Sequence, residues 1–144
     1  MLDGALYAVT DKQERWLLAL DAAGVRHFAE TVEDAPPHLY PMTAGLGTAW
    51  EPLQRCLGEA FPLSHAVLGG RPLCDGEVVV RHVTAAQAQA VALALRRVDE
   101  VWLRQRYGTL VGGDPSAALT AYRHLRDLYD KAAKAARAVV FTAV

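Results

Sequence analysis

The chain of 144 residues is 52% hydrophobic and carries a formal net charge of −1 at pH 7. This composition excludes a disordered chain, because enough apolar surface is available to stabilise a folded core. No run approaches the roughly 18 consecutive apolar residues of a membrane span, and the near-neutral charge argues against a nucleic-acid binder. We therefore expect a single domain over residues 1–144 that binds neither a membrane nor nucleic acid.

The cysteines and the N-terminal charges indicate a compartment. Cys56 and Cys74 form neither a C-x-x-C pair nor a disulfide framework. Charged side chains from Asp3 to Arg15 interrupt the apolar stretch that a signal peptide would need. The sequence therefore predicts a cytoplasmic protein.

The first quarter of the chain predicts a strand followed by two helices. Residues 5–9 form a short apolar run, which favours a strand, and Thr10 is a typical helix N-cap. Apolar spacing predicts a helix over residues 12–23 that ends at Gly24, and a second short helix over residues 25–34.

Prolines and glycines divide the middle of the chain. Three prolines between positions 36 and 41 predict a loop. Thr48 is expected to cap a helix that carries Trp50 and a buried Cys56 on one face. After it, Ser64 is expected to cap one or two helical turns that Gly69 ends in the left-handed conformation.

The second half predicts a strand, three helices and a final strand. Valines at 77–83 favour a strand, and Thr84 and Asp99 are candidate N-caps of the next two helices. Asp114-Pro115 begins a long amphipathic helix, and residues 138–144 form a terminal strand. About three strands and five or six helices predict an α+β fold, with helices packed on a small, mostly antiparallel sheet.

From Thr48 onward the order of features resembles the YfbM-like family of uncharacterised bacterial proteins. The matching features are a helix with an early tryptophan (Trp50), the segment at 62–73, the tetrapeptide at 81–84, the helix after Asp114 and the strand at 138–144. The most specific piece is L-G-G-x-P-L at 68–73. The resemblance implies an α+β fold and a bacterial setting, and it supplies no catalytic residues.

The sequence departs from the family pattern at two places. Residues 85–87 read A-A-Q where the family usually has proline and acidic residues, and G-L-G at 45–47 precedes Thr48 where acidic residues are usual. The first 40 or so residues fit the family only loosely, as a strand followed by a helix.

A first candidate site combines an aromatic residue with basic ones. If the chain brings them together, one pocket could bind an anionic ligand, because pockets usually combine apolar walls with a few polar groups. The residues of this hypothesis are Trp50, His65, Arg71, Arg81 and His82.

A second, weaker candidate is a metal site. Imidazoles and carboxylates are metal ligands, and His27, Glu30 and Asp34 share one face of a helix with His38 nearby. The same spacing is typical of a solvated helical face.

Three other motifs have structural readings that we favour. Ser64 and His65 are neighbours that point about 100° apart on a helical turn, so we do not expect a catalytic dyad. Gly69-Gly70-Arg71 lacks the lysine of a phosphate-binding loop, so we interpret it as a turn. Acidic residues separate the arginines that flank Trp102, which predicts a mixed surface rather than a nucleic-acid patch.

Nothing in the sequence assembles an acid, a base and a nucleophile. The main hypothesis is a non-enzymatic protein–protein interaction module of the immunity or modulator type, without a cofactor. It draws on the opposite net charges of the two halves of the chain, which could steer a charged partner. The alternative is a small-molecule binding protein or an enzyme that uses the pocket near Trp50, His65, Arg71 and His82. The sequence assigns no oligomeric state.

Overall fold

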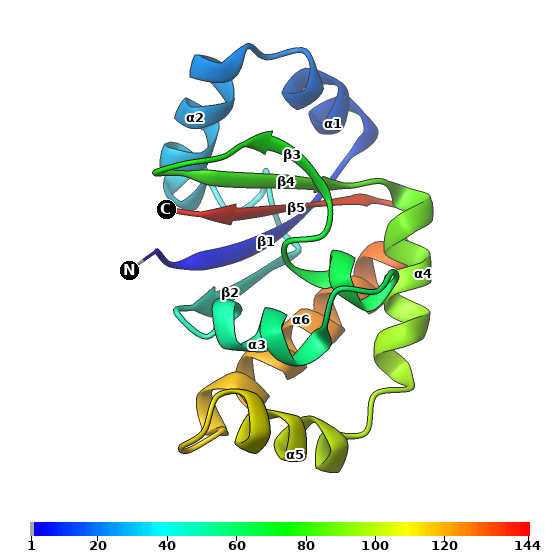
Figure 1. The fold of residues 1–144 in the computed structure, drawn as a ribbon. Helices are drawn as coiled ribbons and strands as arrows, with labels where there is room; N and C mark the ends of the chain where they lie inside the picture. Colours follow the sequence, from blue (N-terminus) through cyan, green and yellow to red (C-terminus); the bar gives the residue numbers. More distant parts are fainter. Residues whose placement is uncertain (1) are drawn as a thin grey trace.

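The strands nearest the two ends of the chain lie side by side at the centre of one antiparallel sheet (Figure 1). The structure is a computed structural model that describes residues 2–144. Within them, the strands follow the spatial order β2-β1-β5-β4-β3. The strands are β1 (Gly4–Val9), β2 (Thr43–Gly47), β3 (Arg71–Cys74), β4 (Val79–Val83) and β5 (Ala138–Ala143).

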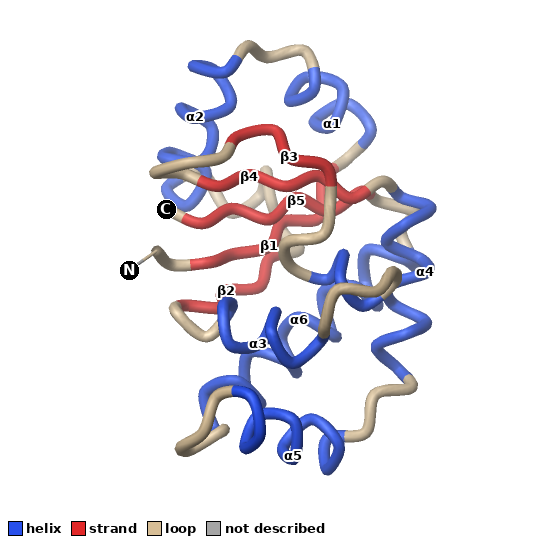
Figure 2. Tube along the Cα trace, in the orientation of Figure 1, coloured by secondary structure: helices blue, strands red, loops and turns tan. Residues whose placement is uncertain are grey.

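Helices cover both faces of this sheet, which confirms the predicted α+β class (Figure 2). The α-helices are α1 (Asp11–Leu18), α2 (Ala22–Thr31), α3 (Trp50–Leu57), α4 (Ala85–Arg96), α5 (Glu100–Leu110) and α6 (Ser116–Lys134), with 3-10 turns η1 (Val32–Asp34) and η2 (Leu63–Ala66). None of the helices in residues 2–144 is both long and apolar enough to span a membrane.

The two faces of the sheet hold two separate cores. On the first face, Leu6 and Phe141 pack with buried residues of α3, α4 and α6. On the second face, Val9 and Val140 pack with buried residues of α1 and α2, among them Phe28. Successive strand residues point to opposite faces, so β1 and β5 contribute to both cores and are buried along nearly their whole length.

Several predicted helix signals are confirmed. Thr10 forms a capping box with Gln13, and Thr84 forms one with Gln87. Asp99 caps α5 by accepting the backbone N–H of Val101 at 2.8 Å. The stripe on α6 is buried at Ala118, Leu119, Tyr122, Leu125, Leu128, Tyr129 and Ala132, as its periodicity predicts.

Other expected helix boundaries are wrong. The helix expected over residues 12–23 ends at Leu18, since Asp21 accepts the N–H of Gly24 at 2.7 Å and caps α2 instead. Thr48 lies outside α3, whose N-cap is Ala49 without a side-chain bond. Gly69 does not have a positive φ; it is glycine because a Cβ would collide with the backbone carbonyl of Ser64.

Two strands were not predicted at all. β2 lies directly after the proline loop, and β3 follows η2, where the sequence indicates only loops and turns. β2 reads T-A-G-L-G, and the low strand propensity of glycine argues against a strand there, although exposed and buried residues alternate along it. These two strands form the edges of the sheet.

Candidate functional site: the groove beside strand β2

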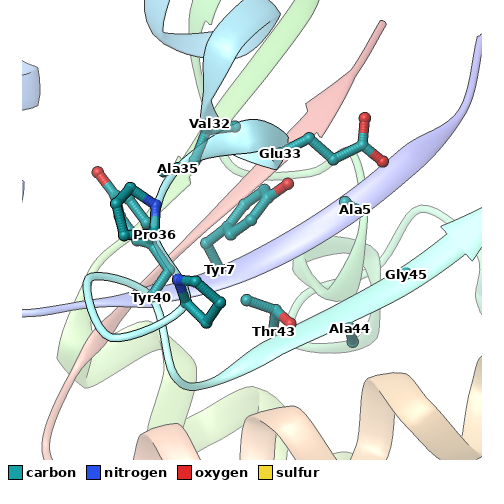
Figure 3. Close-up of a pocket in the computed structure, with 11 residues that line it drawn as sticks. Ala5, Tyr7, Val32, Glu33, Ala35, Pro36, Tyr40, Thr43, Ala44 and Gly45 are labelled. Atoms are coloured by element: carbon teal, nitrogen blue, oxygen red, sulfur yellow. The ribbon is translucent and has the colours of Figure 1, made fainter.

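The second face of the sheet is open over β2. Thr43, Gly45 and Gly47 are exposed there, whereas Ala44 and Leu46 point into the first core. A hollow of about 260 Å³ lies against this open face (Figure 3). Its walls come from β1, β2, η1 and the proline loop, through Ala5, Tyr7, Val32, Glu33, Ala35, Pro36, Pro37, Tyr40, Thr43, Ala44 and Gly45.

A second hollow of about 140 Å³ continues the first along the sheet. The two share Tyr7, Glu33 and Gly45, and the second adds Asp3 and Thr142. We call these two hollows together the β2 groove.

Aromatic contacts fix the shape of the β2 groove. Strand alternation directs Tyr7 to the second face, where its ring meets Tyr40 edge-on at a centroid distance of 5.8 Å. Tyr40 also packs against Phe28 of α2 at 6.3 Å. The proline loop is also bonded to α1, because the side-chain amide of Gln13 donates to the carbonyl of Leu39 at 2.6 Å. The wall is therefore tied to α1, α2 and β1.

The charge in the β2 groove is negative. No lysine, arginine or histidine is among its lining residues, while Asp3 and Glu33 both line it. Burial, and next the charge of Glu33, raise the pKa of Tyr7 to about 12, against a smaller lowering by a hydrogen bond with Thr142. The Tyr7 hydroxyl therefore keeps its proton at neutral pH.

The five residues of the predicted anion pocket are not brought together. Trp50 is buried on the first face, where its indole Nε1 donates to the carbonyl of Leu2 at 2.9 Å and its ring packs against Phe141 at 5.5 Å. It lies so close to β1 that a Cβ on Gly4 would be 2.7 Å from its ring. Its role in the fold is packing.

The basic members of that set are engaged elsewhere. His82 points to the second face and its Nε2 lies 2.6 Å from a carboxylate oxygen of Glu14 on α1. Arg81 points the other way, where it pairs with Asp75 at 2.7 Å and donates to the carbonyl of Leu68 at 3.1 Å. Arg71 is exposed on the edge strand β3 and stands opposite His82 of β4, so these two residues of the set are neighbours. The expected shared pocket is therefore not formed, because neighbours on a strand face opposite sides of the sheet.

Ser64 and His65 depart from our expectation. Ser64 Oγ and His65 Nδ1 lie 3.0 Å apart and form a hydrogen bond, which the tight 3-10 turn η2 permits between neighbours. Ser64 is nevertheless only 6% exposed, and His65 packs edge-on against Phe61 at 4.8 Å. Tyr129 donates to the carbonyls of His65 and Ala66, so the pair belongs to a packed turn.

The structure does not bring together the residues of the weaker candidate, the metal site. Residues 2–144 contain no group of three or more His, Cys, Asp or Glu side chains that could hold a metal ion. Glu30 pairs with Arg26 at 2.7 Å, and the α-helix ends at Thr31, before it can place Asp34 on the face of His27. His38 lies apart on the proline loop.

The arginines around Trp102 form a mixed surface. Arg96 pairs with Asp130 at 2.9 Å, and the Arg106 guanidinium stacks over the Trp102 ring at 5.0 Å. Arg97 lines a shallow hollow with Trp102, and Arg104 is exposed on α5.

Sequence reasoning missed the residues of the β2 groove. Tyr7 and Thr43 come from separate strands, and Glu33 from a short turn, so no local motif joins them. One available signal was the alternation in T-A-G-L-G, which places Ala44 and Leu46 on one side and small residues on the other.

Comparisons with known proteins support the fold. The Escherichia coli protein of unknown function YfbM has a crystal structure that matches all of this chain and all of its own, with a TM-score of 0.69 and 15% sequence identity. Curated proteins give no match. A family model described as a domain of unknown function, DUF1877, matches residues 2–110, including the N-terminal region that fits the sequence pattern only loosely. The chain therefore belongs to the DUF1877 family of domains of unknown function and has the YfbM-like fold.

Proposed function

We propose that this domain is a non-enzymatic protein-binding module, and that its partner adds an extended segment to the open edge of β2. The observation that carries the proposal is a row of outward backbone groups on a strand with hollows on both sides. Strand addition is a general mode of peptide recognition, in which main-chain hydrogen bonds supply affinity and side-chain pockets supply specificity.

The direction of the backbone groups follows from the strand register. Asp3 and Val144 exchange both backbone hydrogen bonds, at 2.9 and 3.1 Å, so odd-numbered residues of β1 bond to β5. Ala8 donates to the carbonyl of Met42 at 3.0 Å, so even-numbered residues bond to the β2 side. Thr43 and Gly45 stand opposite Tyr7 and Ala5, and their N–H and C=O groups therefore point away from the sheet.

The β2 edge lacks two of the features that usually prevent pairing, although it is only five residues long and its pairing with β1 is irregular at Gly4 and Ala5. β2 carries no charged residue and no proline, although edge strands are commonly protected by such residues. The opposite edge begins with Arg71-Pro72, which has both. Of the two edges of the sheet, β2 therefore has the weaker chemical protection against pairing.

Both sides of β2 have room for an incoming strand's side chains. The β2 groove lies on the second face. Two shallow hollows follow β2 on the side of α6, with lining residues that include Leu46 and Thr120 in one and Met42 and His124 in the other. Because successive side chains of a strand alternate, a bound segment would use the groove and these hollows in turn.

Tyr7 is poorly suited to act as a general base in the groove. A general base works best with a pKa near the operating pH, whereas the pKa of Tyr7 is raised to about 12. A role as an immunity protein or modulator remains the more specific prediction from charge. It is consistent with a groove on the acidic N-terminal half of the chain.

A pair of substitutions at Thr43 tests strand addition. Thr43→Pro removes one outward N–H at the first residue of an edge strand, where proline is tolerated, and Thr43→Val keeps that donor. Peptides selected from a display library of random 12-residue segments are synthesised and titrated against each variant. We expect Thr43→Pro to bind about 10-fold more weakly than Thr43→Val, as for one lost hydrogen bond.

Three results would overturn the proposal. The first is a library that yields no binding peptide, and the second is peptides whose affinity does not change in Thr43→Pro. The third is a wild-type dimer in sedimentation that Thr43→Pro dissociates, because the edge would then be occupied by a second copy of this chain.

A further inference from the structure

We infer that the β2 groove recognises an ammonium or guanidinium group, supplied by a lysine or arginine of the segment that pairs with β2. The source of the cation rests on the proposed function, whereas the chemical preference rests on the groove itself. Three features of the groove carry the inference, namely unpaired carboxylates, aromatic rings and an absence of competing cations.

The carboxylates of the groove are not engaged by any side chain that the structure describes. Within residues 2–144, no side-chain hydrogen bond or ion pair engages Glu33 or Asp3. By contrast, the nearby Glu30 is neutralised by Arg26 at 2.7 Å. Glu33 lines both hollows, so its charge acts along the whole groove. A cation that enters gains a charge-assisted contact without first displacing a native partner.

Aromatic rings beside a carboxylate also favour a cation. The rings of Tyr7 and Tyr40 stand edge to face, and Figure 3 shows Tyr40 next to Pro36, with Tyr7 between Tyr40 and Glu33. A cation over a tyrosine face is attracted by the ring's negative quadrupole. Tyr7 is only 5% exposed, so the partly exposed ring of Tyr40 is the one that a cation in the groove can reach. An anionic group would instead meet the charge of Glu33 in the same space.

The geometry of β2 directs one side chain of a paired segment into the groove. Gly45 faces the groove, has no left-handed φ, and a Cβ built on it would have nothing within 4 Å. The space over Gly45 is therefore open. A lysine or arginine of the added strand can extend over Gly45 toward Glu33.

Defined peptides test this preference. The probes are acetylated, amidated pentapeptides of sequence T-V-X-V-T, in which X is lysine, arginine, norleucine or glutamate. Binding to isotopically labelled protein is followed by the amide shifts of Thr43 and Gly45. We expect the lysine and arginine peptides to bind about 10-fold more tightly than the norleucine peptide, and the glutamate peptide to bind most weakly. Glu33→Gln should remove this difference, and Glu59→Gln, a control in the loop after α3, should leave it unchanged.

Equal binding of the four peptides would overturn the inference while leaving strand addition intact, provided that Thr43→Pro weakens all of them. A cation preference that persists in Glu33→Gln would also overturn it. If no pentapeptide binds, a lysine introduced on β2 itself tests the cation preference of the groove. Gly45→Lys should then have a higher urea midpoint than Gly45→Met, and Glu33→Gln should abolish that gain. Equal midpoints would overturn the inference.

Discussion

The register of β2 leads to a sharp prediction about two adjacent residues. Ala44 pairs with Leu6, and its N–H points toward β1. Thr43 points its N–H outward. Proline at position 44 therefore removes a hydrogen bond between β2 and β1 and leaves the backbone carbonyl of the fully buried Leu6 without its donor. Proline at position 43 removes no hydrogen bond within the protein.

The magnitudes of the two substitutions should differ clearly. A lost hydrogen bond together with an unsatisfied buried carbonyl costs about 2–4 kcal/mol for Ala44→Pro. Thr43→Pro should change the free energy of unfolding by less than about 1 kcal/mol, because proline also restricts the unfolded chain. The corresponding fall in Tm for Ala44→Pro is roughly 6–12 °C.

Urea unfolding followed by circular dichroism measures both variants, with Thr43→Val and Ala44→Val as controls for side-chain shape. If Thr43→Pro is destabilised as much as Ala44→Pro, the outward direction of the Thr43 donor is wrong. The strand-addition proposal would then lose its main support.

Three further predictions concern stability. Gly69→Ala should destabilise the protein by about 2 kcal/mol or more, because its Cβ would collide with the Ser64 carbonyl. Gly108→Ala, at a helical position with open space around it, should instead stabilise the protein by up to about 1 kcal/mol. Tyr129→Phe removes the donor to the buried carbonyl of Ala66 and the partly buried carbonyl of His65, and should lower the unfolding free energy by about 1–3 kcal/mol. An unchanged urea midpoint would mean that water replaces the hydroxyl. The pKa of Tyr7 is raised from 10.0 to about 12, so its contribution to stability is complete below pH 10 and is lost as the pH rises through 12; Tyr7→Phe should therefore show a smaller fall in stability over that window.

The sequence predicted those elements that local interactions specify. Thr10 and Thr84 begin helices because each forms a capping box within four residues. The long helix α6 was predicted because its apolar stripe repeats at helical spacing over 19 residues. In contrast, the boundary between α1 and α2 was predicted wrongly. In the sequence, Gly24 is suited to end a helix, but in the structure its N–H donates to Asp21, which caps the start of α2.

The candidate site could not be predicted in the same way. Trp50 and His82 are compatible with one pocket in a linear sequence, yet they lie on opposite faces of the sheet. Tyr7 and Glu33 look unremarkable in sequence. They line one groove only because β2 pairs with β1 and leaves its second face open.

The sequence by itself determined the α+β class, most of the helices, the three inner strands of the sheet (β1, β4 and β5) and the resemblance to the YfbM-like family. Those features depend on composition, short-range capping and periodicity, which act within a few residues of each other. Only the tertiary structure decided which strands form the edges and which carboxylates are left unpaired. Both features depend on contacts between segments that are distant in the sequence. Thr43 of β2 pairs with Tyr7 of β1, and α2 and η1 pack on the second face of the sheet. The open edge of β2 and its acidic groove therefore emerge only when the chain is folded.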